Sequence, residues 1–290
     1  MEILDLIKNV PIIKFGYKSS EIYSLLEQFN ITWSIKIKPV YWMIKSAIES
    51  GHLTKDKIIL EASSWNTAIW LAYLSSFFGY RTILVIPKST AEFKKNIIKF
   101  YGWELIETDG NTDDSIKYRD EVYAKNKDKY FLIDQFNNFW NFESHYHITG
   151  PYIYEKLGKI DFFAAGLWTS WTILWAWMYL KEKIPNLKII AINPIWKLEW
   201  LRNYKESPVK WAFYEKYNYI IDEVVDVSFG NDSIKWIQDY LESGYFVWPS
   251  SWAILSWTKN FLKDKKWLKW AVIAPDWWNF YAKDLIQYIK

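Results

Sequence analysis

Residues 61–67 place small hydrogen-bonding side chains between an apolar run and an apolar helix. The segment reads Glu-Ala-Ser-Ser-Trp-Asn-Thr, and it follows a strand predicted at Lys57–Leu60 and precedes a helix predicted over Ala68–Phe78. Its hydroxyl and amide groups therefore fall at a helix N-terminus, where free backbone N–H groups and the positive end of the helix dipole favour an anion. A single Ser or Asn would suffice for an ordinary helix cap, so the cluster indicates either a cap or a turn that holds a carboxylate.

Three further turns share this composition. Each is rich in hydroxyls, precedes a predicted helix and contains tryptophan where a tight turn normally uses glycine; they are Thr32–Lys36, Trp168–Thr172 and Trp248–Trp252. Thr169, Ser170 and Thr172 at a helix N-terminus would form a cup for a phosphate group. Lys36, if it lies near that cup, could form a Schiff base with a carbonyl cofactor, whereas a lone lysine is more often a solvated surface residue.

Composition excludes several kinds of protein. The 36 basic and 33 acidic residues leave a net charge of +3, too small and too dispersed to indicate binding to nucleic acid or an acidic membrane. Cysteine is absent, so disulfides, thiolate metal sites and a cysteine nucleophile are excluded. Met1–Asp5 carries acids and lacks a basic start before an apolar core, so we expect no secretion signal and a cytoplasmic location.

Predicted strands alternate with predicted helices along most of the chain, which indicates parallel sheets covered by helices on both faces. The N-terminal part is predicted as a helix at Leu4–Lys8, an extended segment at Pro11–Phe15, a helix around Glu21–Phe29 and a helix at Pro39–Ser50 that Gly51 ends. The later strands are expected at Thr82–Pro87, Trp103–Glu107, Phe131–Ile133, Phe162–Ala165, Leu187–Ile192 and Ala271–Ala274. The intervening helices are expected at Ala91–Tyr101, Arg119–Lys127, Ile173–Lys183, Ser233–Ser243 and Trp252–Leu262.

This pattern predicts an α/β protein with two doubly wound parallel-sheet domains and an active site in the cleft between them. Residues 30–138 are expected to form a smaller, mobile domain, and residues 1–29 with 139–290 a larger one, joined by a polar crossover near residues 134–150. Phe162–Leu180 is long and uncharged enough for a membrane span, but its tryptophans fall through the middle of the segment, so a strand, a polar turn and a helix explain it better.

Six segments repeat, in order, a set of known motifs. Lys8–Ile12 is similar to Gly-Asn-Thr-Pro-Leu, Trp33–Lys36 to Gly-Ser-Val-Lys, Ser63–Ala68 to Thr-Ser-Gly-Asn-Thr-Gly, Asp134–Phe136 with Ile148–Pro151 to Gln-Phe and Thr-Gly-Pro, Trp168–Thr172 to Gly-Thr-Gly-Gly-Thr, and Trp248–Trp252 to Gly-x-Ser-Ser-Gly. The chain thus resembles, nearly end to end, the cysteine synthase family of pyridoxal-phosphate enzymes, the fold type II group that also includes cystathionine β-synthase.

The resemblance implies a role for each candidate residue. Lys36 is the expected catalytic residue and the Schiff-base lysine for pyridoxal 5'-phosphate. The cofactor phosphate is expected at Thr169, Ser170 and Thr172, the pyridine nitrogen at Ser250, and the 3'-oxygen at Asn66. Substrate carboxylate binding is expected from Ser63, Ser64, Asn66, Thr67 and Gln135, on a loop carried by the smaller domain, while the larger domain carries the phosphate loop. No metal is expected, and His145 and His147 are interpreted as structural or solvated.

The resemblance also implies a reaction. The expected activity is β-replacement, which forms L-cysteine from an O-activated serine and sulfide through an aminoacrylate intermediate, with Lys36 as the base at Cα. The expected partners are this small amino acid, the nucleophile and a second copy of the chain in a homodimer, with no nucleic acid and no membrane. The family's Asp-Arg after the lysine is replaced by Ile37-Lys38, so a cystathionine β-synthase or diaminopropionate synthase type stays open; these would differ near Lys197–Pro208.

Tryptophan is unusually frequent, at 21 residues, and glycine is scarce, at 10. Where the family has glycine, this chain has Trp33, Trp65, Trp168, Trp171, Trp248 and Trp252; Trp70, Trp103, Trp175 and Trp177 replace glycine or another small residue. We hypothesise that most of these positions are UGA codons that the source organism reads as glycine and that were translated here as tryptophan. If the indoles are real, we expect a catalytically dead α/β protein with blocked turns.

Overall fold

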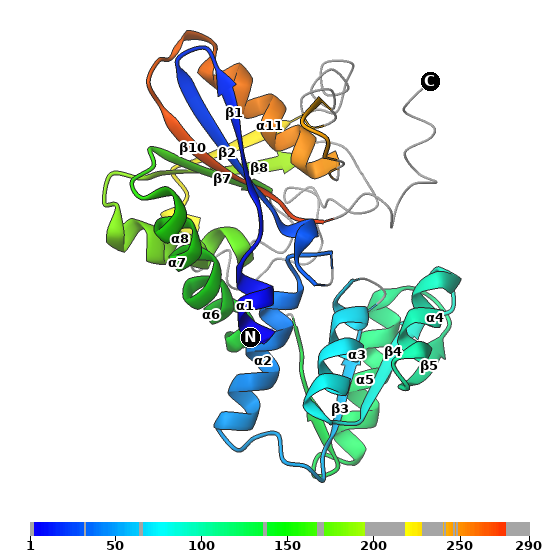
Figure 1. Cartoon of the computed structure of the whole chain (residues 1–290). Helices are drawn as coiled ribbons and strands as arrows, with labels where there is room; N and C mark the ends of the chain where they lie inside the picture. The colour runs from blue at the N-terminus through cyan, green and yellow to red at the C-terminus, as the bar shows by residue number, and fades with distance from the viewer. Residues whose placement is uncertain are drawn as a thin grey trace. The chain divides into compact units, whose positions relative to one another are not determined.

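The computed structural model of the chain divides into two compact units, which are described separately (Figure 1). One unit consists of Met1–Ile35 and His145–Lys290, and the other of Lys36–Ser144. The structure describes residues 3–31, 33–63, 66–135, 138–166, 171–194, 218–227, 240, 242–245, 247 and 249–276. The smaller domain predicted from the sequence, residues 30–138, begins and ends slightly before the unit Lys36–Ser144.

The unit Lys36–Ser144 is built on a four-stranded parallel sheet with strand order β5-β4-β3-β6. The strands are β3 (Ile58–Ala62), β4 (Thr82–Pro87), β5 (Glu104–Thr108) and β6 (Tyr130–Leu132), and the helices between them are α3 (Asn66–Phe78), α4 (Glu92–Phe100) and α5 (Thr112–Lys125). All residues of β3 and β4 are buried, as expected for continuous apolar strands in a parallel sheet. Helices α2 (Ile37–Glu49) and α6 (Phe139–Ser144) pack against each other in the same unit.

The path of the chain changes direction inside this sheet. From β3 to β5 successive strands are added on one side, and the chain then returns to place β6 on the other side of β3. Because crossovers between parallel strands are right-handed, α3 and α4 lie on one face of the sheet and α5 on the other. The carboxyl ends of β3 and β6 therefore meet at a topological switch point, which is where α/β sheets bind ligands.

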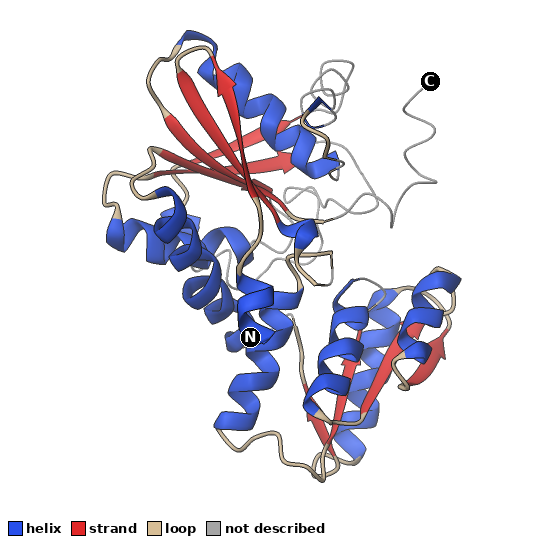
Figure 2. Cartoon of the chain, in the orientation of Figure 1, coloured by secondary structure: helices blue, strands red, loops and turns tan. Residues whose placement is uncertain are grey.

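The other unit contains a six-stranded sheet with strand order β1-β2-β10-β7-β8-β9, shown in red in Figure 2. Its strands are β1 (Ile12–Tyr17), β2 (Ser20–Leu26), β7 (Phe162–Gly166), β8 (Lys188–Pro194), β9 (Glu223–Val227) and β10 (Lys269–Ala274). Only the β1–β2 pair is antiparallel among the strand pairs described. Helix α11 (Pro249–Phe261) packs on one face, and α8 (Trp171–Lys183) with α7 (Gly150–Leu157) lies on the other (Figure 1).

The predicted α/β architecture with parallel sheets is confirmed, but one local prediction is wrong. The expected helix at Glu21–Phe29 is strand β2 followed by a 3₁₀ turn at Glu27–Phe29. A two-residue turn at Lys18 and Ser19 pairs β2 with β1, and β10 pairs with its other edge. Pairing with β1 and β10 makes this segment a strand, because the periodicity of such a short apolar segment is compatible with either a helix or a strand.

The crossover predicted near residues 134–150 spans the boundary between the two units, at Ser144 and His145. It contains α6 and a π-helical turn at His145–Thr149 that leads into α7, helical structure that the sequence did not predict. The remaining predicted strands and helices lie within a few residues of observed ones, except that α5 begins at Thr112, well before the predicted Arg119. The predicted helix Ser233–Ser243 falls mostly outside the described residues, and the segment Lys197–Pro208 falls outside them entirely.

Several tryptophans occupy positions that are unfavourable for an indole. Trp33 and Trp267 have φ angles of 59° and 61°, in the left-handed region that favours glycine. Trp177 and Trp270 are fully buried, and their Nε1 groups have no hydrogen-bond partner within the described part of the chain. Glycine would meet neither difficulty, so both observations agree with the glycine hypothesis. Trp103 differs, because its Nε1 donates to the carbonyl oxygen of Ala72 at 2.6 Å.

The segment Phe162–Leu180 forms β7 and most of α8, as the strand, turn and helix interpretation predicts. Across the described ranges, no helix has both the length and the apolar character needed to cross a membrane.

Candidate active site

The polar segment after β3 leads directly into α3, as predicted. Ser63 is buried, and its backbone N–H donates to the carbonyl oxygen of Val85 in the neighbouring strand at 3.1 Å. Helix α3 begins at Asn66, and Thr67 is buried in its first turn. Ser64 and Trp65 lie outside the described residues, and only the backbone of Asn66 is described. The segment thus provides a helix N-terminus at the carboxyl end of a central strand, where backbone N–H groups can hold an anion.

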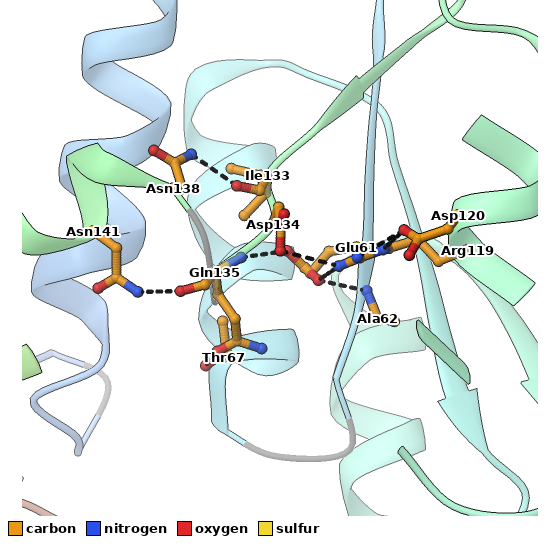
Figure 3. Close-up of polar contacts among 10 residues, drawn as sticks. All are labelled: Glu61, Ala62, Thr67, Arg119, Asp120, Ile133, Asp134, Gln135, Asn138 and Asn141. Atoms are coloured by element: carbon orange, nitrogen blue, oxygen red, sulfur yellow. Dashed lines mark hydrogen bonds and ion pairs between the residues drawn. The ribbon is translucent and has the colours of Figure 1, made fainter. Parts of the chain in front are cut away.

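Gln135 lies beside this helix N-terminus. It follows β6, which pairs in parallel with β3, so the carboxyl ends of the two strands are neighbours. The Thr67 hydroxyl donates to Gln135 Oε1 at 2.7 Å, and Asn141 Nδ2 donates to the Gln135 carbonyl oxygen at 2.6 Å (Figure 3). Two of the residues predicted to bind a substrate carboxylate, from distant parts of the sequence, are therefore in direct contact.

A buried ion pair supports these two segments, and the sequence interpretation missed it. Glu61 is fully buried near the end of β3 and accepts a hydrogen bond from Arg119 Nη1 of α5 at 2.8 Å. Burial raises the pKa of the Glu61 carboxyl, and the nearby Arg119 guanidinium opposes that shift. The sequence did show an acidic residue, Glu61, near the end of an apolar strand. Its partner, Arg119, is distant in the sequence, so the pairing could not be predicted.

Lys36 immediately precedes α2 and is partly exposed. In the segment before it, Asn30 Nδ2 donates to the Ser34 carbonyl oxygen at 2.6 Å, the Ser34 hydroxyl donates to Asp276, and the Ile35 N–H donates to the Pro275 carbonyl oxygen at 2.8 Å. After it, Ile37 and Lys38 are both fully buried. The replacement of the family's Asp-Arg by Ile37-Lys38 therefore concerns side chains packed inside the protein.

The predicted phosphate loop connects β7 to α8 in the other unit. Strand β7 ends at Gly166, and α8 begins at Trp171, so Thr172 lies in its first turn. The order of strands reverses between β7 and β10, which makes the carboxyl end of β7 a second topological switch point. Thr169 and Ser170 fall outside the described residues, and the side chain of Thr172 is not described.

The last predicted turn leads into α11, whose first residues are Pro249 and Ser250. The side chain of Ser250 is not described, but that of its neighbour Ser251 is fully buried, and its hydroxyl has no hydrogen-bond partner among the residues that the structure places. Buried hydroxyls almost always have a partner, so an unpaired one fits a ligand atom. In the same unit the sequence places Thr169, Ser170 and Thr172 at the start of α8, where hydroxyl and backbone N–H groups suit a phosphate group. The sequence interpretation chose Ser250 as the candidate site residue and did not consider Ser251, although the two serines are adjacent in the sequence.

The two histidines near the crossover differ in exposure. His145 is buried, and its Nδ1 lies 2.9 Å from the Thr149 hydroxyl, whereas His147 is exposed. The glycine of the same motif, Gly150, starts α7 where that helix meets α8. A Cβ atom at Gly150 would lie 2.8 Å from Tyr179 Cβ and 3.0 Å from the Ala176 carbonyl oxygen, so close helix packing requires glycine.

The fold is that of an α/β protein with switch points suited to ligand binding, and comparison with known proteins names the family. The chain belongs to the pyridoxal-phosphate dependent enzyme family, whose model matches residues 3–268. It is 30% identical over 266 residues to the cysteine synthase of Aquifex aeolicus, covering 87% of this chain and 80% of that protein. The resemblance to the cysteine synthase family is thus confirmed, and the cofactor is pyridoxal 5'-phosphate.

Solved structures show the same fold. A cysteine synthase structure from Entamoeba histolytica superposes with a TM-score of 0.88 at 24% identity, covering 100% of this chain and 91% of that one. An O-acetylserine dependent cystathionine β-synthase from Helicobacter pylori gives a TM-score of 0.82 at 25% identity, covering 98% of this chain and 97% of that one. The chain is therefore a cysteine synthase-like pyridoxal-phosphate enzyme, and structures named as cysteine synthase and as cystathionine β-synthase share its fold.

Proposed function

We propose that the chain catalyses a β-replacement that forms L-cysteine from an O-activated serine and sulfide. The observation that supports this most directly is the hydrogen bond between Thr67 and Gln135, because it joins two expected carboxylate-binding residues at one switch point. Since Gln135 Oε1 accepts the Thr67 hydroxyl, the amide nitrogen Nε2 is directed away from Thr67 and is a donor suited to a carboxylate. The similarity to the Aquifex cysteine synthase supports the same substrate class.

Each expected site residue has a defined task in this proposal. Bound pyridoxal phosphate supplies an electron sink that stabilises negative charge on the substrate Cα. Lys36 would hold the cofactor and would serve as the general base for the proton on Cα. The hydroxyls of Thr169, Ser170 and Thr172 would hold the phosphate at the start of α8, where the helix dipole favours an anion.

The substrate is held through its carboxylate. Ser63, Ser64, Asn66, Thr67 and Gln135 provide hydroxyl and amide groups around the start of α3, and Asn66 also serves the cofactor 3'-oxygen. Ser250 provides a neutral hydroxyl at the pyridine nitrogen; unlike a carboxylate, a serine leaves this nitrogen unprotonated, which suits elimination at Cβ. The Ser251 hydroxyl is buried and has no hydrogen-bond partner among the described residues, which makes this neighbour a second candidate for the same atom.

The cofactor assignment is tested by reduction. Purified protein incubated with pyridoxal phosphate should show a visible absorption band that borohydride abolishes, and peptide mass mapping should then find the pyridoxyl group on Lys36. Lys36→Ala should lack the band, while Lys38→Ala, which changes the neighbouring lysine, should retain the label at position 36 if it folds. A colourless protein that ignores pyridoxal phosphate would contradict the proposal.

A cystathionine β-synthase type of reaction is the second candidate, and it is favoured by the similarity to the Helicobacter pylori enzyme. Product analysis with O-acetylserine separates the possibilities: sulfide should give cysteine, homocysteine should give cystathionine, and an amine should give diaminopropionate. A homodimer and a cytoplasmic location belong to the same proposal. If the tryptophans at glycine positions are real, we instead propose a catalytically dead α/β protein, and we expect no cofactor band.

A further inference from the structure

The Glu61 carboxylate is bonded to both segments of the proposed carboxylate site. Its Oε1 accepts the backbone N–H of Ala62 at 2.8 Å, just before the polar segment that leads into α3. Its Oε2 accepts the backbone N–H of Gln135 at 3.1 Å, just after β6 (Figure 3). One fully buried side chain thus joins the carboxyl ends of two neighbouring strands.

Arg119 fixes the orientation of this carboxylate. Its Nη1 donates to Glu61 Oε1 at 2.8 Å, while its Nε and Nη2 donate to Asp120 Oδ1 at 2.9 and 2.8 Å. The Arg119 side chain is only 3% exposed, and three carboxylates lie around its guanidinium: the buried Glu61, the half-exposed Asp120 and, at 3.8 Å from Nη1, Asp134. Charge-assisted hydrogen bonds of this kind restrict geometry strongly.

The Gln135 peptide is held on both sides. Glu61 accepts its N–H, Asn141 donates to its carbonyl oxygen at 2.6 Å, and Thr67 donates to its side chain at 2.7 Å. The preceding residue, Asp134, has a φ angle of 45°, which non-glycine residues adopt only where the surroundings stabilise it. Loss of the Glu61 contact would therefore release the backbone that aims the Gln135 amide.

We propose that Glu61 is a positioning residue for the amino-acid carboxylate: through Arg119 it is fixed in one orientation, and through Ala62 and Gln135 it sets the spacing of the two binding segments. The inference rests on the proposed function for the identity of the ligand. It assigns Glu61 a role through Gln135 and Thr67, with no contact of its own to substrate or cofactor.

The test compares Glu61→Gln with a matched control. Glu107→Gln removes the charge from a more exposed ion pair in the same sheet, in which Lys95 Nζ donates to Glu107 Oε2 at 2.6 Å. Glu107 has no bond to Gln135 among the contacts described. We expect Glu61→Gln to raise the KM for O-acetylserine about tenfold, the effect of losing ~1.4 kcal/mol of hydrogen bonding, with kcat changed less than about twofold. Glu107→Gln should leave KM and kcat unchanged. Both variants should retain the cofactor band.

A second measurement does not depend on catalysis. In the cofactor-free protein, amide hydrogen exchange at Gln135 should be at least about tenfold faster in Glu61→Gln than in wild type, because a weaker acceptor protects this N–H less. An unchanged KM in a variant that keeps the cofactor band would overturn the inference. If wild type itself binds no cofactor, the proposed function fails. The positioning role is then tested by hydrogen exchange alone: equal exchange rates at Gln135 in wild type and Glu61→Gln overturn it. Should Glu61→Gln not fold, Arg119→Lys replaces it, with the same direction expected for both readouts.

Discussion

Replacement of Trp267 by glycine should stabilise the protein, and the expected size follows from its backbone. Trp267 has a φ angle of 61°, which costs a non-glycine residue about 1–2 kcal/mol. Glycine removes this strain but adds about 0.4–1 kcal/mol of chain entropy to the unfolded state. The indole is 81% exposed, so little buried area is lost. Trp267→Gly should therefore raise the free energy of unfolding by about 0.5–1 kcal/mol.

A control at Trp257 should respond in the opposite direction. Trp257 lies inside helix α11 in the same unit, with its ring 5.1 Å from that of Phe261 and 5.9 Å from that of Trp270. Relative to tryptophan, glycine there loses about 0.5 kcal/mol of helix propensity and about 0.5–1.5 kcal/mol for each aromatic contact. Trp257→Gly should lower the unfolding free energy by at least about 1.5 kcal/mol.

Urea unfolding followed by far-ultraviolet circular dichroism measures these changes without relying on tryptophan fluorescence. Trp267→Ala separates the two possible causes, because alanine removes the indole but keeps the Cβ atom and hence the strain. We expect no gain from alanine. An equal gain from alanine and glycine would show that the exposed indole, and not the backbone, is responsible, and the backbone argument for a glycine position would fail.

Three further predictions address the codon hypothesis, helix packing and acid stability. The intact mass of the protein isolated from its source organism should be lower than the printed sequence requires by a whole number of Trp-to-Gly exchanges, whereas agreement with the printed sequence would refute the UGA hypothesis. Gly150→Ala should destabilise by about 1–3 kcal/mol in urea unfolding, because its Cβ would crowd Tyr179 and Ala176, while Gly16→Ala, whose Cβ meets nothing within 4 Å, should not destabilise; equal losses would contradict the packing argument. Burial acts to raise the pKa of Asp222, but hydrogen bonds from Lys181, Lys188 and the Ile189 N–H outweigh it and hold that pKa below its ordinary value. The stability that this carboxylate contributes, at most about 1 kcal/mol because the pair is partly exposed, is present above the ordinary Asp pKa of about 3.9 and is lost as the pH falls through the lowered value. Asp222→Asn should therefore be less stable than wild type at neutral pH and approach it in acid, and a difference that persists unchanged in acid would count against this assignment.

The sequence by itself determined the fold class and predicted where ligands could bind. Continuous apolar runs such as Thr82–Pro87 predict buried parallel strands, because both faces of such a strand are covered. Hydroxyl-rich turns before helices predict anion sites, because helix N-termini carry unpaired N–H groups. Both signals are local, so a single chain is enough to read them. The tryptophans at glycine positions were also visible without any structure.

Only the tertiary structure decided how distant segments meet. Strand β2 was mistaken for a helix because its partners, β1 and β10, are supplied by pairing that local periodicity does not encode. The Glu61–Arg119 ion pair and the Thr67–Gln135 contact depend on the parallel pairing of β3 with β6 and on the crossover that brings α5 to the sheet. Sequence patterns show which residues can do chemistry, but strand order places them within hydrogen-bonding distance. Contacts between residues that are distant in sequence depend on how the chain folds in three dimensions.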